Sequence, residues 1–271
     1  MRHLTFSAIF LLFLFINSIV LSSPTEQENV EEKKIDELKV RDCLLPIHHP
    51  LQARLNHLFK HPDMFESPEH LRENGFQVIE RLDRRLMVAS HPKLKNYLIK
   101  KFQNEVPCKR QLRNYLSRIN GARRLRQFIA SHQLKHIVTP KKWLYRLSDL
   151  FPDPKKGKRT YVLIVEKIEM CTEEQDLNEE IARRYYHIDF DVLKELCLVV
   201  YHFRGLDSAL RNMPFTRQNK IAFIDTECWN CEREGFLERV LPFMSQDRQD
   251  YALDIFEKLK KQALIVPTSS P

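Results

Sequence analysis

The spacing of apolar and polar residues predicts strands in the first half of the chain, with one long helix among them. Short apolar runs rich in β-forming residues predict strands at 76–82, 85–90 and 97–102, and the clearest strand pattern covers 160–165. Between them, apolar residues recur at helical spacing and leave an opposite face rich in arginine. These helical apolar positions are Leu112, Leu116, Ile119, Ala122, Leu125 and Ile129.

The second half of the chain has a mostly helical pattern. The apolar run 190–203 predicts a buried helix that is broken at Gly205, and amphipathic helices are predicted over 235–264. A single apolar run at 220–224 predicts a strand. This order predicts an α+β fold with two lobes, a small mixed lobe followed by a reduced helical lobe, and a cleft between them.

The N-terminal segment has the layout of a secretory signal peptide. Arg2 and His3 precede an apolar run over 4–21, and small residues follow that run. We therefore expect residues 1–23 to be a signal peptide, residues 24–42 to be a polar linker, and the protein to be exported or secreted. An uncleaved membrane anchor is the alternative. No later segment is long and apolar enough to span a bilayer.

Charge is concentrated in one part of the chain. The 44 Lys and Arg and 36 Asp and Glu give a net charge of +8, and the 43% of hydrophobic residues excludes intrinsic disorder. The segment 93–159 holds 19 of the basic residues and 3 acids, so it carries +16 and the remainder carries −8. This block predicts either a solvated basic face or a site for an anionic ligand. We do not expect nucleic acid there, because the interleaved aromatic residues have the spacing of core positions.

Six cysteines follow the apolar segment, and an even number in an exported chain permits disulfides. Cys228 and Cys231 form the one close pair, which is compatible with a local disulfide, a redox pair or half of a zinc site. No second close pair of Cys or His completes a zinc pattern. The six positions are Cys43, Cys108, Cys171, Cys197, Cys228 and Cys231.

Polar residues that suit phosphoryl transfer follow the buried helix. Asp207 and Asn212 lie five positions apart after Gly205, and the strand 221–224 ends directly at Asp225. In phosphoryl transfer one carboxylate accepts the proton of the acceptor hydroxyl, while an amide oxygen and a second carboxylate hold Mg²⁺ beside the phosphates. The structural alternative is that Asp207 and Asn212 only cap a turn or a helix start.

At these residues the chain resembles the protein-kinase-like superfamily. The sequence Ile224-Asp225-Thr226-Glu227 is more similar to the Ile-Asp-x-Glu of its small-molecule phosphotransferase branch than to the Asp-Phe-Gly of protein kinases. The resemblance implies Asp207 as the catalytic base, and Asn212 and Asp225 as ligands of Mg²⁺, with ATP as the phosphate donor.

The same resemblance assigns the basic block to a nucleotide-binding lobe. It implies that Lys100, on the strand 97–102, binds phosphate, although Lys101 fits the pattern almost as well. It also implies that Glu166 lies where the last strand of this lobe runs into the hinge and contributes to nucleotide binding. The lobes would cover 43–168 and 169–271.

The chain also departs from the family pattern. It has no glycine-rich phosphate loop, Leu206 precedes Asp207, and no acid between Val106 and Ser148 is present to pair with Lys100. Two functions are therefore predicted. The first is an exported kinase-like protein that transfers phosphate from Mg-ATP to an unknown acceptor. The alternative is a catalytically inactive kinase-like protein, or a basic binding protein that engages an acidic partner.

Overall fold

The computed structural model of the chain describes residues 40–60, 62–81, 86–102, 106, 108–147, 161–171, 177–227 and 235–265. The chain divides into two compact units, 1–42 and 43–271, and the fold described below is that of the second unit. The expected signal peptide, nearly all of the expected linker, and Cys228 and Cys231 lie outside the described residues. Among the helices that are described, none has both the length and the apolar character needed to cross a membrane.

An antiparallel sheet of five strands forms the first half of this unit, in the order β1-β2-β3-β6-β5. Its strands are β1 (Gln77–Arg81), β2 (Leu86–Ser90), β3 (Tyr97–Phe102), β5 (Lys142–Arg146) and β6 (Tyr161–Glu166). The predicted strands at 76–82, 85–90, 97–102 and 160–165 are confirmed by these positions. The strand β5 was not predicted, and it pairs with β6 along its whole length.

Two short helices cover one face of the sheet. They are α3 (Leu51–Leu58) and α4 (Pro68–Glu73), and their apolar residues share one core with Ile99 of β3. The Ser67 Oγ accepts a hydrogen bond of 3.2 Å from the His70 N–H, which caps the start of α4. The 3₁₀ turns η1 (Pro62–Phe65) and η3 (Pro92–Leu94) complete this part of the chain.

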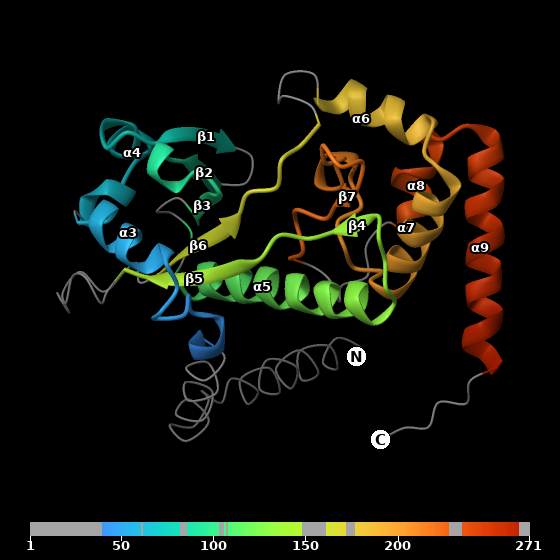
Figure 1. The fold of residues 1–271 in the computed structure, drawn as a ribbon, viewed down its shortest axis with the longest axis horizontal. Helices are drawn as coiled ribbons and strands as arrows, with labels where there is room; N and C mark the ends of the chain where they lie inside the picture. Colours follow the sequence, from blue (N-terminus) through green and yellow to red (C-terminus); the bar gives the residue numbers. More distant parts are fainter. Residues whose placement is uncertain are drawn as a thin grey trace, which may run out of the picture. The chain divides into compact units, whose positions relative to one another are not determined.

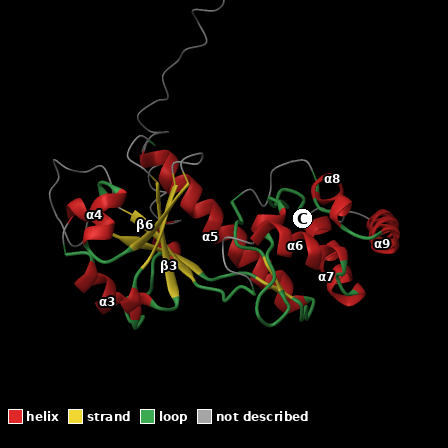
Figure 2. Cartoon of the chain, turned by 90° about the horizontal axis from the view of Figure 1, so that it is seen from above, coloured by secondary structure: helices red, strands yellow, loops and turns green. Residues whose placement is uncertain are grey.

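The long helix α5 (Cys108–Ser131) lies on the other face of the sheet (Figure 2). Its Tyr115 is buried, and the Tyr115 hydroxyl accepts a hydrogen bond of 3.1 Å from the Phe102 N–H of β3. Because side chains alternate across a strand, the residues of β3 on the side of Phe102 face α5. The predicted helix over Leu112–Ile129 is confirmed and is extended at both ends.

The second half of the unit is mainly helical and has a core of its own. The helix α7 (Phe190–His202) is buried along most of its length and packs against α9 (Gln246–Ile265). This confirms the buried helix predicted at 190–203. The remaining helical elements are α6 (Leu177–Tyr186), η6 (Leu210–Asn212), α8 (Phe236–Arg239) and η7 (Leu241–Phe243).

A short parallel pair, β4 (Ile137–Val138) with β7 (Ile221–Ala222), joins the end of α5 to the second half of the unit. The helix α5 contacts both β4 and β5, and in Figure 1 it runs beside them as the green helix. Leu125 near the end of α5 belongs to the helical core, whereas Tyr115 packs under the sheet. The α+β class is therefore confirmed, and α5 contributes residues to both halves.

Candidate functional site

The segment after β7 is held on both sides by backbone hydrogen bonds. The Phe223 carbonyl accepts a hydrogen bond of 2.9 Å from the Thr139 hydroxyl, and the Ile224 N–H donates one of 3.0 Å to the Asn212 carbonyl. Phe223 and Thr139 are both buried. The backbone that leads into Asp225, the residue after Ile224, is therefore held in a fixed position.

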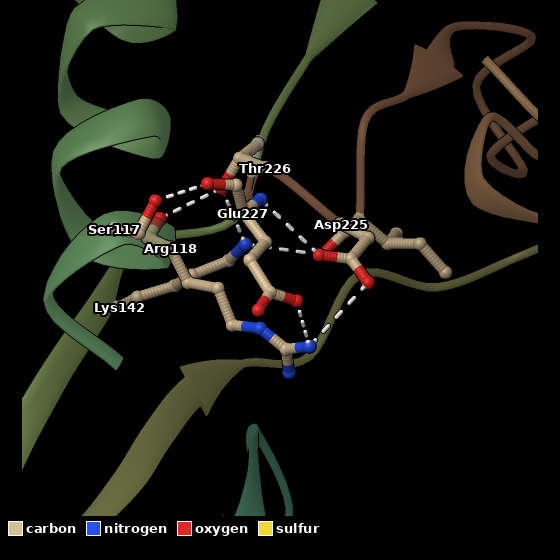
Figure 3. Close-up of polar contacts among 7 residues, drawn as sticks. Ser117, Arg118, Lys142, Asp225, Thr226 and Glu227 are labelled. Carbon is tan, nitrogen blue, oxygen red and sulfur yellow. Dashed lines mark hydrogen bonds and ion pairs between the residues drawn. The ribbon is translucent and has the colours of Figure 1, made fainter. Parts of the chain in front are cut away.

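Arg118 of α5 binds both acids of the Ile-Asp-x-Glu segment (Figure 3). Its Nη2 lies 2.6 Å from the Glu227 Oε2 and 3.7 Å from the Asp225 Oδ2. The Glu227 N–H also donates a hydrogen bond of 3.3 Å to the Asp225 Oδ1. The Arg118 side chain is only 5% exposed, so this ion pair belongs to the protein interior.

Side chains from α5 and β5 hold the backbone of the same segment. Lys142 donates hydrogen bonds of 3.0 Å to the Ile224 carbonyl and 2.8 Å to the Thr226 Oγ1. The Thr226 hydroxyl donates one of 2.7 Å to the Arg118 carbonyl, and the Ser117 hydroxyl donates one to the Glu227 carbonyl. The segment is therefore tied to a helix and to a strand at the same time (Figure 3).

The charges around Asp225 control its ionisation. Burial raises the pKa of Asp225, but the positive charges of Arg118, Lys100 and Lys142 lower it by more, so this pKa lies well below its usual range. Burial lowers the pKa of Arg118, and Asp225 and Glu227 raise it by more. Asp225 and Arg118 are therefore held in their charged forms.

Lys142 is the most buried cation of the site. Burial of its amine, together with the charge of Lys100, lowers the pKa of Lys142 well below its ordinary value, while Asp225 opposes this shift. An amine in this position is a weaker base than a surface lysine, but it keeps its two hydrogen bonds in either protonation state.

The structure separates Lys100 from Lys101. Lys101 lies on the face of β3 that carries Ile99, where its Nζ donates hydrogen bonds of 2.9 Å to the Phe65 carbonyl and 3.3 Å to the Phe102 carbonyl. Lys100 lies on the face of β3 that packs against α5, and its charge acts on Asp225. Lys100, expected at the phosphates, and Asp225, expected at the metal ion, therefore influence one another electrostatically.

Asn212 and Asp207 lie on the loop after α7. Asn212 is 2% exposed, and within the described part of the chain its side-chain Nδ2 has no hydrogen-bond partner. The Asp207 Oδ1 accepts hydrogen bonds of 3.3 Å from the Ala209 N–H and 3.1 Å from the Arg239 Nη1. The Ala209 contact is the turn-capping role that was the structural alternative for Asp207, and Arg239 adds an ion pair to it.

Glu166 ends β6 beside the start of β5. Its N–H donates a hydrogen bond of 2.9 Å to the Lys141 carbonyl, and its Oε2 accepts one of 3.2 Å from the Lys141 N–H. These contacts fix the end of the last strand of the sheet. The contribution of Glu166 to nucleotide binding stays a prediction.

The acids of the site do not fit a Mg²⁺ ion in this arrangement. Asp225 and Glu227 are both engaged by Arg118, and in the described ranges no group of three or more His, Cys, Asp or Glu side chains converges on one point. A divalent cation prefers several oxygen ligands that are not already paired with another cation. The charged groups that lower the pKa of Asp225 are instead the side chains of Arg118, Lys100 and Lys142.

The sequence did not identify Lys142 or the partners of Arg118. Lys142 occupies a strand position between Pro140 and the apolar residues 143–145, so a strand pattern was the one signal for its burial. Within the described residues, Nε and Nη1 of Arg118 are buried and have no hydrogen-bond partner. Each such group costs about 1–3 kcal/mol, which reduces the net contribution of Arg118 to stability.

No protein-family model matches this chain, and no curated protein matches it. The interpretation of the site therefore depends on its own residues and geometry.

Proposed function

We propose that this protein binds the phosphate groups of a nucleotide such as ATP, in a kinase-like site between two lobes. The observation that carries the proposal is that Arg118 forms an ion pair with Asp225 and that the charges of Lys100 and Lys142 act on the same carboxylate. Phosphate is the common biological anion that such a set of cations recognises, and a nearby carboxylate orients the cations without neutralising all of them.

The order of the elements supports the kinase-like interpretation. In that family the phosphate-binding lysine lies on the third strand and the next helix supplies its usual partner. Here Lys100 is on the third strand and α5 follows that strand. Asp225, which the resemblance implies as a metal ligand, lies three positions after the end of β7. The helix α5 contributes Arg118 where the family pattern has an acid, so the charge of this helix is reversed.

The reversed charge changes the role of the helix. A glutamate would hold Lys100 by direct pairing, whereas Arg118 pairs with Asp225 and Glu227 instead. Asp225 then takes over the electrostatic contact with Lys100. The lysine keeps a carboxylate nearby, and Arg118 adds a positive charge where the family pattern has a negative one.

Thermal unfolding in the presence of ATP tests the proposal. We expect ATP to raise the Tm of the full chain, because a ligand that binds only the folded state stabilises it. Lys100→Met removes the cation and is expected to abolish the shift. Lys95→Met, at an exposed position just before β3, is the matched control and should retain it. If no nucleotide raises the Tm of the wild-type chain, nucleotide binding is rejected.

Phosphoryl transfer is the second candidate. The hydrogen bond between the Asn212 carbonyl and the Ile224 N–H keeps the Asp207–Asn212 loop attached to the segment that carries Asp225. Asp207 would act as the base on an acceptor hydroxyl after its contact with Arg239 is released.

Labelled ATP separates the two candidates. Phosphoryl transfer or hydrolysis that is lost in Asp207→Asn, with ATP binding retained, supports catalysis. ATP binding without any transfer or hydrolysis in the wild-type chain leaves a kinase-like binding protein.

A further inference from the structure

One guanidinium occupies the position between the two acids of the Ile-Asp-x-Glu segment. The Arg118 Nη2 contacts the Glu227 Oε2 at 2.6 Å and the Asp225 Oδ2 at 3.7 Å, and the side chain is 5% exposed. An arginine keeps its charge at all physiological pH values, so the contact persists wherever both acids are ionised. The two carboxylates therefore have an internal cation that is part of the chain.

A divalent cation in a nucleotide site has two electrostatic tasks. It neutralises the carboxylates that hold it, and it brings positive charge to the phosphates. Arg118 performs the first task through its ion pairs with Asp225 and Glu227. Lys100 lies on the face of β3 that packs against α5, its charge acts on the same Asp225, and it would perform the second task.

The surroundings also oppose the entry of a metal ion. A Mg²⁺ ion at Asp225 would have to displace the Arg118 guanidinium from the carboxylates. The guanidinium would then be buried without the acids that now bind it. Among the described residues, Asp225 and Glu227 are the ionic partners of Arg118. The Nε and Nη1 of Arg118 have no hydrogen-bond partner there. The ion would also face repulsion from the positive charge of Lys100, which acts on the same carboxylate.

We propose that Arg118 replaces the divalent cation in this site, and that the protein binds nucleotide phosphates without Mg²⁺. This inference rests on the proposed nucleotide binding and specifies its cofactor requirement. It assigns Arg118 as a positioning residue that acts through Asp225 and Glu227.

Calorimetric titration of the full chain with ATP, in excess EDTA and then in excess Mg²⁺, tests the inference. The expected Kd values differ by less than about twofold between the two conditions, a difference of under roughly 0.5 kcal/mol. Binding that is lost in EDTA and restored by Mg²⁺ would overturn the inference and leave the proposed function intact. Absence of nucleotide binding in both conditions would reject the proposed function, and the inference with it.

Arg118→Gln tests the residue itself. We expect this change to weaken ATP binding in EDTA by at least about tenfold, or roughly 1.4 kcal/mol, because Asp225 and Glu227 then repel the phosphates. Added Mg²⁺ should recover most of this loss, because the two carboxylates become open to the ion. Arg113→Gln, an exposed arginine on the same helix, makes the same change in net charge and should bind ATP as the wild type does in both conditions.

A structural role alone would not make binding depend on metal. Equal Kd values for Arg118→Gln and the wild type in EDTA would therefore overturn the role of Arg118. If Arg118→Gln fails to fold, the comparison of EDTA and Mg²⁺ on the wild-type chain decides the inference.

Discussion

Asp225 and Asp207 each contact an arginine, but the two ion pairs have different surroundings. Arg118, which binds Asp225, is 5% exposed and comes from a long helix under a five-stranded sheet. Arg239, which lies 3.1 Å from Asp207, is 36% exposed and comes from the four-residue helix α8. The two acids are about equally buried, so the two pairs differ in the exposure of the arginine.

This difference gives the two ion pairs different expected contributions to stability. The charge of Asp225 is influenced by Arg118, Lys100 and Lys142, and its main partner is buried. The partner of Asp207 is partly exposed to water, so this second ion pair is expected to contribute less. The two acids therefore differ mainly in the burial of their partners.

The largest effect is expected from Arg118→Leu. Removing one partner of a buried ion pair leaves Asp225 and Glu227 without their main cation and should lower the free energy of unfolding by about 3 kcal/mol. Urea denaturation measures this change. The double variant with Asp225→Asn should lose less than the sum of the two single variants, because both changes remove one interaction. Strict additivity would show that the pair contributes no coupling.

Acid titration of stability isolates Asp225. Its pKa in the folded state lies below that in the unfolded state, which is about 3.9 for Asp, so the unfolded state binds the proton more readily. The contribution of Asp225 is therefore present above about pH 4 and is lost as the pH falls toward the folded-state pKa. The stability difference between wild type and Asp225→Asn should shrink over this interval. A difference that stays constant with pH would contradict the electrostatic role of Asp225.

Much of the frame around Asp225 was predictable from the sequence. The strands β1, β2, β3 and β6 and the helices α5 and α7 follow regular apolar spacing, which depends on local pattern alone. The strand β5 was missed because Lys142 is a buried cation at a core position. Its burial depends on the Ile224 carbonyl and the Thr226 hydroxyl, which are distant in the sequence.

The site itself was predictable only in part. The spacing of Asp207, Asn212 and Asp225 indicated the loop and the strand end, but not that Arg118 would contact Glu227, which lies 109 positions away. The sequence also left Lys100 and Lys101 as near equals, because each occupies one face of an alternating strand. The choice depends on which helix covers which face, and here α5 covers the face that carries Lys100.

Thr226→Val tests how the Asp225 segment is held. Thr226 is fully buried, and its hydroxyl donates to the Arg118 carbonyl and accepts from Lys142. Valine has nearly the same shape but leaves both groups without that partner, so we expect a loss of about 1–3 kcal/mol in urea denaturation. Thr226→Ser retains the hydroxyl and is the matched control. Equal losses for the two variants would show that packing of the methyl group, rather than the hydrogen bonds, stabilises the segment.

The smallest effect is expected from Arg239→Gln. The Asp207 contact that this change removes is partly exposed to water, and exposed ion pairs contribute about 0–1 kcal/mol, so the free energy of unfolding should change by less than about 1 kcal/mol. Urea denaturation in low and high salt measures the loss, which should fall further in high salt because water and ions screen the pair. A loss as large as that of Arg118→Leu would mean that both acids are held by structural ion pairs. The distinction between the two ion pairs would then fail.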